Sequence, residues 1–136
     1  MNRLANLAWL LVLMLSPFAA MAQDFNGKKP LICSTIEVYD CEPGGDCIRG
    51  QAQDIGAPQF FFLDFEKGMA KTVRAGSDER TSPIKTVQTE SGELILQGAQ
   101  SGRAWSATIG QESGTLVLSV AGDGVAFVLF GACTPM

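Results

Sequence analysis

Residues 91–129 read SGELILQGAQSGRAWSATIGQESGTLVLSVAGDGVAFVL, which is four short apolar segments separated by glycine-containing turns. The turn sequences recur 9 to 12 residues apart and are Ser91-Gly92, Ser101-Gly102, Ser113-Gly114 and Gly122-Asp123-Gly124. Glycine supplies the positive φ that tight hairpins need, and this spacing is typical of hairpin-connected strands in sandwiches and barrels. The stretch therefore predicts four consecutive antiparallel strands.

Apolar and polar side chains alternate within these segments, so one face of each strand is expected to lie in the core. The expected inward residues are Leu94, Leu96, Trp105, Ala107, Ile109, Leu116, Leu118, Val120, Val125, Phe127 and Leu129. Four earlier strands are expected at residues 31–40, 58–66, 69–74 and 84–90, with loops at 51–57 and 76–83. Because no segment keeps a helical period, the fold class is expected to be all-β.

Eight short strands joined mainly by hairpins favour a small antiparallel up-and-down β-barrel, with a β-sandwich as the alternative. A meander leaves its first and last strands as open edges unless the two strands pair. Closure removes both edges. The pattern therefore predicts a barrel in which the terminal strands are neighbours.

The first 22 residues have the features of an export signal. Arg3 is followed by an apolar stretch over residues 4–15 and by Ala20-Met21-Ala22, which is typical of a signal-peptidase site before Gln23. The apolar stretch is shorter than the roughly 20 residues that a membrane-spanning helix needs. We expect residues 1–22 to be a cleaved signal peptide and residues 23–136 to be a single periplasmic or secreted domain without a membrane span.

Four cysteines in an exported chain predict two disulfides rather than a metal site or a redox pair. Three pairings are possible, and we favour Cys33 with Cys133 and Cys41 with Cys47. The first bond would join the two ends of the barrel and the second would close a local loop. Strict alternation places Cys33 and Cys133 on faces that do not match, so a bulge near Gly131 is expected.

Charge and composition exclude several classes of function. Arg3 is the only charged residue before residue 23, so residues 23–136 hold 9 basic and 14 acidic side chains, a net charge of −5. The basic residues are scattered, which argues against nucleic acid as a partner. The chain has no histidine, so it lacks the commonest general base and the commonest transition-metal ligand. We expect no catalytic residue, no cofactor and no metal, and therefore no enzyme.

Three groups of residues were weighed as candidate sites. The acidic loop 40–46 offers oxygen atoms suited to calcium, but its spacing matches no established calcium loop, and a solvated, disulfide-closed loop is the favoured interpretation. Asp64 and Glu66 are two residues apart on one strand, but carboxylate pairs in glycosidases come from different elements. Arg103 and Trp105 share a face near one end of the barrel, where the guanidinium could stack on the indole and meet an anionic ligand.

The C-terminal half of the chain resembles small exported bacterial proteins of unknown function. The resemblance rests on Arg80-Thr81-Ser82-Pro83-Ile84, Gly98, Gly102-Arg103-Ala104-Trp105-Ser106, Ala121-Gly122-Asp123-Gly124 and Phe130-Gly131-Ala132-Cys133. It implies a secreted or periplasmic domain. Ser101-Gly102 and Trp105 are also similar to part of the loop motif of periplasmic inhibitors of c-type lysozyme, which implies a comparable architecture. The tyrosine, second glycine and Phe-Trp pair of that motif are missing, so no inhibitor residue carries over.

These features together predict a non-catalytic binding or interaction module of the bacterial cell envelope. One alternative is a lipocalin-like carrier of a small apolar ligand, which requires an interior cavity. Another is an inhibitor of a lysozyme or other hydrolase, which requires a protruding loop, with residues 40–47 the best candidate. The expected inward side chains are large, so a closed eight-stranded barrel should be filled.

Overall fold

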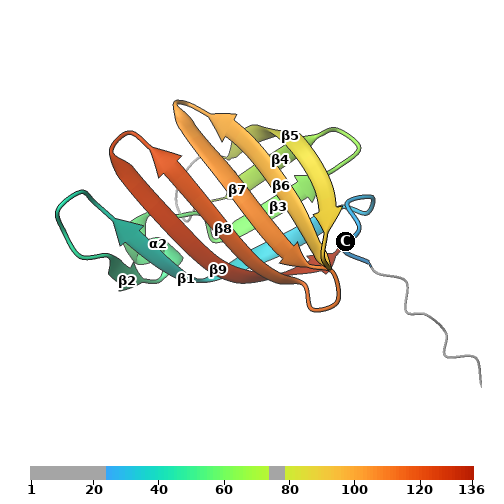
Figure 1. Cartoon of the computed structure of the whole chain (residues 1–136), viewed down its shortest axis with the longest axis horizontal. Helices are drawn as coiled ribbons and strands as arrows, with labels where there is room; N and C mark the ends of the chain where they lie inside the picture. Colours follow the sequence, from blue (N-terminus) through green and yellow to red (C-terminus); the bar gives the residue numbers. More distant parts are fainter. Residues whose placement is uncertain (1–23, 74–78) are drawn as a thin grey trace, which may run out of the picture.

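The computed structural model describes residues 24–73 and 79–136. The expected signal peptide, residues 1–22, lies outside the described residues. Nine strands and one short helix make up the described chain (Figure 1). They are β1 (Leu31–Cys41), β2 (Ile48–Gly50), α2 (Ala52–Ile55), β3 (Phe60–Asp64), β4 (Met69–Val73), β5 (Arg80–Glu90), β6 (Glu93–Gln100), β7 (Arg103–Gly110), β8 (Thr115–Gly122) and β9 (Val125–Pro135). Within the described ranges, no helix has the length and apolar character to cross a membrane.

The strands close into an antiparallel up-and-down barrel, as the sequence predicted. From β3 to β9 each strand pairs with the next, and β1 pairs with β3 on one side and with β9 on the other. These eight strands form the closed ring, so the barrel prediction is confirmed and the sandwich alternative is wrong. The ninth strand, β2, was not expected. It pairs with residues 38–40 of β1, whereas β3 pairs with residues 31–34 of the same strand.

A β-bulge divides β1 into two halves. Thr35 pairs with Gly131 and Glu37 pairs with Phe130, so Ile36 is an extra residue without a partner on β9. A bulge near Gly131 was expected, and the structure has one there: the extra residue lies on β1, next to Thr35, which pairs with that glycine. Gly131 makes the arrangement possible, because a Cβ atom there would lie 2.1 Å from the backbone oxygen of Ser34.

The bulge brings Cys33 and Cys133 onto the inner face. The two residues are directly opposite each other in the register, and both are buried. Their sulfur atoms are 2.04 Å apart, and a second disulfide joins Cys41 to Cys47. This is the pairing that the sequence favoured. The Cys33–Cys133 bond, called the terminal disulfide below, connects the first strand of the barrel to the last.

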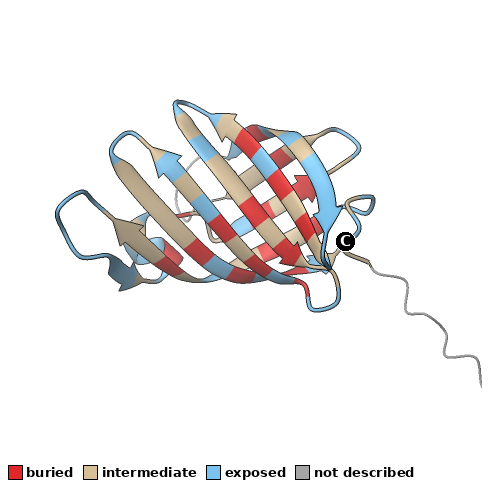
Figure 2. Cartoon of the chain, viewed as in Figure 1, coloured by how far each residue is buried: buried red, intermediate tan, exposed pale blue. Residues whose placement is uncertain are grey.

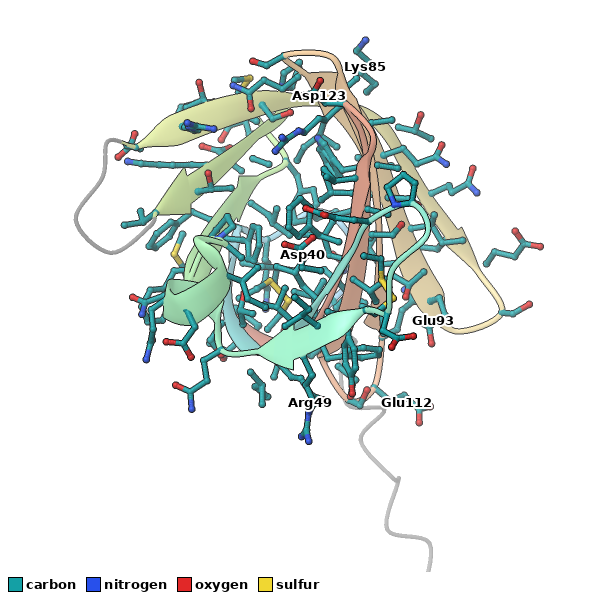
Figure 3. The ribbon with its side chains drawn as sticks, turned by 90° about the vertical axis from the view of Figure 1, so that its left-hand side faces the viewer. Asp40, Arg49, Lys85, Glu93, Glu112 and Asp123 are labelled. Carbon is teal, nitrogen blue, oxygen red and sulfur yellow. A yellow bond between two sulfur atoms is a disulfide. The ribbon has the colours of Figure 1, made fainter. Side chains whose placement is uncertain are left out.

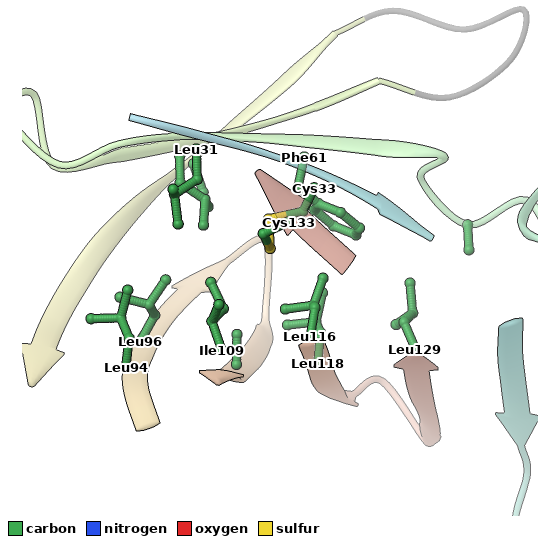
Figure 4. Packing of buried hydrophobic residues seen from close by; sticks show 14 of the residues in the cluster. Leu31, Cys33, Phe61, Leu94, Leu96, Ile109, Leu116, Leu118, Leu129 and Cys133 are labelled. Carbon is green, nitrogen blue, oxygen red and sulfur yellow. A yellow bond between two sulfur atoms is a disulfide. The ribbon is translucent and has the colours of Figure 1, made fainter. Parts of the chain in front are cut away.

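Large aliphatic side chains fill the barrel at the end that carries the C-terminus (Figures 1 and 4). Buried and exposed residues alternate along the strands, which confirms the expected inward faces (Figure 2). The core residues with the least exposure are Leu31, Cys33, Val38, Leu94, Leu96, Ile109 and Leu129. The arm before β1 adds Phe25, which packs against this core and whose carbonyl accepts a hydrogen bond from Gln111 Nε2 at 3.3 Å.

The opposite end, which we call the barrel mouth, carries loop 41–47, α2, and the β6–β7 and β8–β9 turns (Figure 1). Inward side chains near the mouth are less buried than those at the other end. Trp105, Val120 and Phe127 pack against the core but remain partly exposed. The mouth is therefore the end of the barrel at which inward side chains reach solvent.

Candidate functional site

A single layer of inward residues crosses the barrel mouth. In the strand register Asp40 is opposite Phe127, and Phe127 is opposite Val120. Val120 is in turn opposite Trp105, and Trp105 is opposite Gly98. One carboxylate, two aromatic rings and one aliphatic side chain are therefore presented together from β1, β9, β8 and β7.

Trp105 occupies a fixed position in this layer. A Cβ atom at Gly98 would lie 2.3 Å from the indole ring, so the glycine provides the space in which the ring lies. The indole Nε1 donates a hydrogen bond to Ser82 Oγ at 2.9 Å. Ser82 is a buried polar residue on β5, and this bond satisfies the polar group that the tryptophan would otherwise leave unpaired.

Arg103 lies at the rim of the mouth but does not stack on Trp105 as the sequence suggested. Its guanidinium carbon is 5.9 Å from the centre of the Phe127 ring. One of its terminal nitrogens is 3.8 Å from the carboxylate of Asp123, in the β8–β9 turn. The expected partner was wrong because Trp105 extends toward β5 and Ser82, which leaves Phe127 as the aromatic ring beneath the guanidinium.

Asp40 is the feature of the mouth that the sequence analysis missed. Its Oδ1 atom is buried and has no hydrogen-bond partner among the described residues. Viewed from the mouth, Asp40 lies within the ring of strands, whereas Arg49 and Lys85 point away from it (Figure 3). The sequence predicts that Asp40 belongs to the acidic loop 40–46, and strict alternation along β1 would place its side chain on the outer face. The bulge at Ile36 reverses that assignment.

The acidic loop does not bring its carboxylates together. Asp40 lies inside the barrel, while Glu42 and Asp46 are exposed on the loop that the second disulfide closes. Among the described residues, no group of three or more carboxylate, cysteine or histidine side chains could hold a metal ion. The calcium interpretation of this loop therefore gains no geometric support.

A hollow of about 410 Å³ lies on the outer surface beside this loop. Its lining residues are Glu37, Tyr39, Cys47, Val128 and Phe130. The rings of Tyr39 and Phe130 meet edge to face, with their centres 6.0 Å apart. A large aromatic side chain at an outward position of β9 is the sequence feature that could have revealed this surface.

A second hollow, of about 210 Å³, lies where α2 approaches β1 and the start of β3. Ile36 and Phe60 line it and are 67% and 43% exposed. Residues 51–53 of the neighbouring segment therefore cover Phe60 only in part. Both hollows lie on the outside of the barrel.

Asp64 is the last residue of β3 and Glu66 lies in the β3–β4 turn, so the two carboxylates do not share the expected strand. Asp64 accepts hydrogen bonds from Lys67 Nζ at 2.8 Å and from the Lys67 backbone N–H at 3.0 Å, and so closes the β3–β4 turn. The bond from the Lys67 side chain lowers the pKa of Asp64 below its usual value. A general acid needs a raised pKa, so this environment opposes that role.

No protein-family model matches the chain, and a search of curated proteins found no match to it. The two resemblances suggested by the sequence therefore stay predictions. The functional argument depends on the surfaces described above.

Proposed function

We propose that this chain is an exported, non-catalytic binding module that contacts a partner protein of the cell envelope. The docking surface would consist of loop 41–47 and the adjoining hollow lined by Tyr39, Val128 and Phe130. The observation that supports this proposal best is the exposure of large apolar side chains beside a covalently closed loop. Phe130 is 39% exposed and Ile48 is 68% exposed.

The disulfide suits loop 41–47 to recognition. A loop held in one conformation loses little conformational entropy when it binds, so more of the contact energy appears as affinity. Cys41 is the last residue of β1 and Cys47 directly precedes β2, so both ends of the loop are anchored at the sheet. The loop is therefore a rigid projection at the barrel mouth.

The charges around the docking surface indicate the character of the partner. Glu42 and Asp46 are exposed on the loop, whereas Glu37 is held in an ion pair by Arg49. The free carboxylates form an acidic rim beside an apolar centre. A partner with basic side chains around an apolar anchor would complement both, because rim charges guide association and buried aromatic anchors supply most of the affinity.

The same surface would serve an inhibitor of a basic hydrolase, since an inhibitor needs a protruding loop. The carrier alternative has less support. Buried leucine and isoleucine side chains occupy the barrel below the mouth, where a carrier would need a cavity.

Replacing the aromatic residue at the centre of the docking surface should abolish specific capture. The whole chain would be immobilised and then exposed to an extract of the cell envelope. Phe130→Ser is expected to weaken retention of the partner at least tenfold, which corresponds to about 1.4 kcal/mol of binding free energy. Dissociation constants measured with the captured protein by surface plasmon resonance would give the ratio.

Val87→Ser is the matched control for this experiment. Val87 is 46% exposed on β5, outside the docking surface, and its loss should leave retention unchanged. Glu42→Gln should slow association and flatten its dependence on salt, because the rim charge acts on encounter. Equal retention by the unaltered chain, Phe130→Ser and Val87→Ser would exclude the docking surface as the site of contact.

A further inference from the structure

The bulge in β1 places a carboxylate where the rest of the mouth is apolar or aromatic. Val38 is completely buried, and Asp40 is two residues further along the same face of β1. Phe127 lies directly across from Asp40 on β9. Asp40 as a whole is partly exposed, although its Oδ1 atom is buried and unpartnered. The carboxylate therefore faces the mouth with one oxygen removed from solvent.

Two cationic side chains described near the mouth pair with other carboxylates. Arg103 lies 3.8 Å from Asp123, and Arg49 is paired with Glu37. Within the described ranges, Asp40 makes no ion pair. A buried carboxylate oxygen without a donor is unfavourable, so this position favours any molecule that brings a positively charged hydrogen-bond donor to it.

The residues beside Asp40 suit an ammonium group with an apolar body. Trp105 presents a partly exposed aromatic ring, and ring faces attract organic cations. Phe127 is also partly exposed and already has the Arg103 guanidinium 5.9 Å from its ring centre, so it contributes apolar contact. Val120 lies between these two residues in the layer and adds an aliphatic contact. A metal ion fits less well, because it would need several oxygen ligands and this layer provides a single carboxylate.

The depth of the mouth limits the size of such a molecule. The inward residues of the layer below are Ala107, Leu118 and Leu129, and all three are buried. Their burial means that, on the β7–β9 side, the inward side chains of the mouth layer are the ones that solvent reaches. A bound molecule would lie across the mouth rather than enter the barrel, which favours a short chain or a single ring.

From this geometry we infer that the barrel mouth binds a small organic amine, with Asp40 as the counter-ion of its ammonium group and with Phe127 and Trp105 contacting its apolar body. This site lies within the ring of strands, whereas the proposed docking surface consists of the outer face of β1 and β9 and of loop 41–47. Either one can fail without affecting the other.

Tryptophan fluorescence offers a direct test, because the chain contains only Trp9 and Trp105. In the whole chain carrying Trp9→Phe, all tryptophan emission comes from the mouth. Titration with n-hexylammonium is expected to change that emission saturably. The same titration with 1-hexanol or hexanoate, which have apolar chains of equal length, should give at least tenfold weaker binding.

Asp40→Asn keeps the shape of the side chain and removes its charge. We expect at least tenfold weaker binding of hexylammonium to this variant, with binding of hexanol unchanged. Asp54→Asn, at an exposed position of α2 beside the mouth, is the matched control and should change the affinity for hexylammonium by less than twofold. Near-ultraviolet circular dichroism would show that both variants keep the native packing.

The inference is wrong if hexylammonium leaves the Trp105 emission unchanged, or if hexanol binds as tightly as the amine. It is also wrong if folded Asp40→Asn binds hexylammonium like the unaltered protein. The comparison of the three hexyl compounds needs no variant at residue 40, so the test stands even if Asp40→Asn fails to fold.

Discussion

Replacing Cys33 and Cys133 together by alanine is expected to lower the free energy of unfolding by about 5 kcal/mol. The two cysteines are 100 residues apart in the sequence, so their bond restricts most of the unfolded chain. In the loop-entropy description, a disulfide that closes a longer loop stabilises the folded state more, because it removes more conformations of the unfolded chain. Urea unfolding under non-oxidising, non-reducing conditions, followed by circular dichroism, would measure the loss.

The double variant Cys41→Ala/Cys47→Ala is the matched comparison. Its cysteines are six residues apart, and the same description gives a loss of only about 2 kcal/mol. The difference between the two losses tests the mechanism, since each variant removes one disulfide. Equal losses would show that the terminal disulfide does not act by restricting the unfolded chain.

Gly131→Ala is expected to destabilise the barrel by about 3 kcal/mol, at the upper end of the range for overpacking. The new Cβ atom would lie 2.1 Å from the Ser34 backbone oxygen, and backbone cannot move aside as a flexible side chain can. To relieve this contact, β1 and β9 would have to separate beside the terminal disulfide. Thermal and urea unfolding of the disulfide-bonded protein would measure the effect.

Gly45→Ala is a matched glycine substitution without a steric conflict. The nearest atom to a Cβ at Gly45 is the Glu42 backbone oxygen, at 3.9 Å, and the site lies in loop 41–47. We expect a change of less than about 1 kcal/mol, since restricting a loop glycine in the unfolded state is neutral or slightly stabilising. A similar loss in both variants would mean that the close approach at Gly131 is relieved without cost.

The barrel itself could be predicted from the sequence. The turns from Ser91-Gly92 onward set the hairpins, and apolar alternation between Leu94 and Leu129 set the inner face of the last four strands. The pairing of the first and last strands followed from the need to remove open edges. These features are local or topological, so a single sequence carries them.

The irregular positions could not be predicted. Ile48, Arg49 and Gly50 form a strand too short to show alternation, and it depends on pairing with β1 rather than on its own pattern. A second register shift lies between Ile84 and Thr86 in β5. The mismatch between the expected faces of Cys33 and Cys133 indicated a bulge near Gly131. Only the pairing of β1 with β9 identifies Ile36 as the extra residue.

Which residues line the candidate sites also depends on the position of the extra residue in β1. Alternation counted from Cys33 places Asp40 outside, and only the register shift at Ile36 brings it into the mouth. Phe130 shows the converse case, an aromatic residue at an outward position that the sequence analysis did not single out. Both residues became visible through the pairing of β1 with β9, because their environment is formed by the neighbouring strand.

Ile36 also separates β1 into two halves that can differ in length without affecting each other. Residues 31–35 include Cys33 of the terminal disulfide, and residues 37–41 lead to the mouth. Because Ile36 between them is unpaired, the inward positions of one half do not depend on those of the other. Deleting Ile36 would leave Thr35 opposite Gly131 and Glu37 opposite Phe130, with every inward side chain still inward. The first strand therefore has one position at which a change of length need not alter the packing on either side.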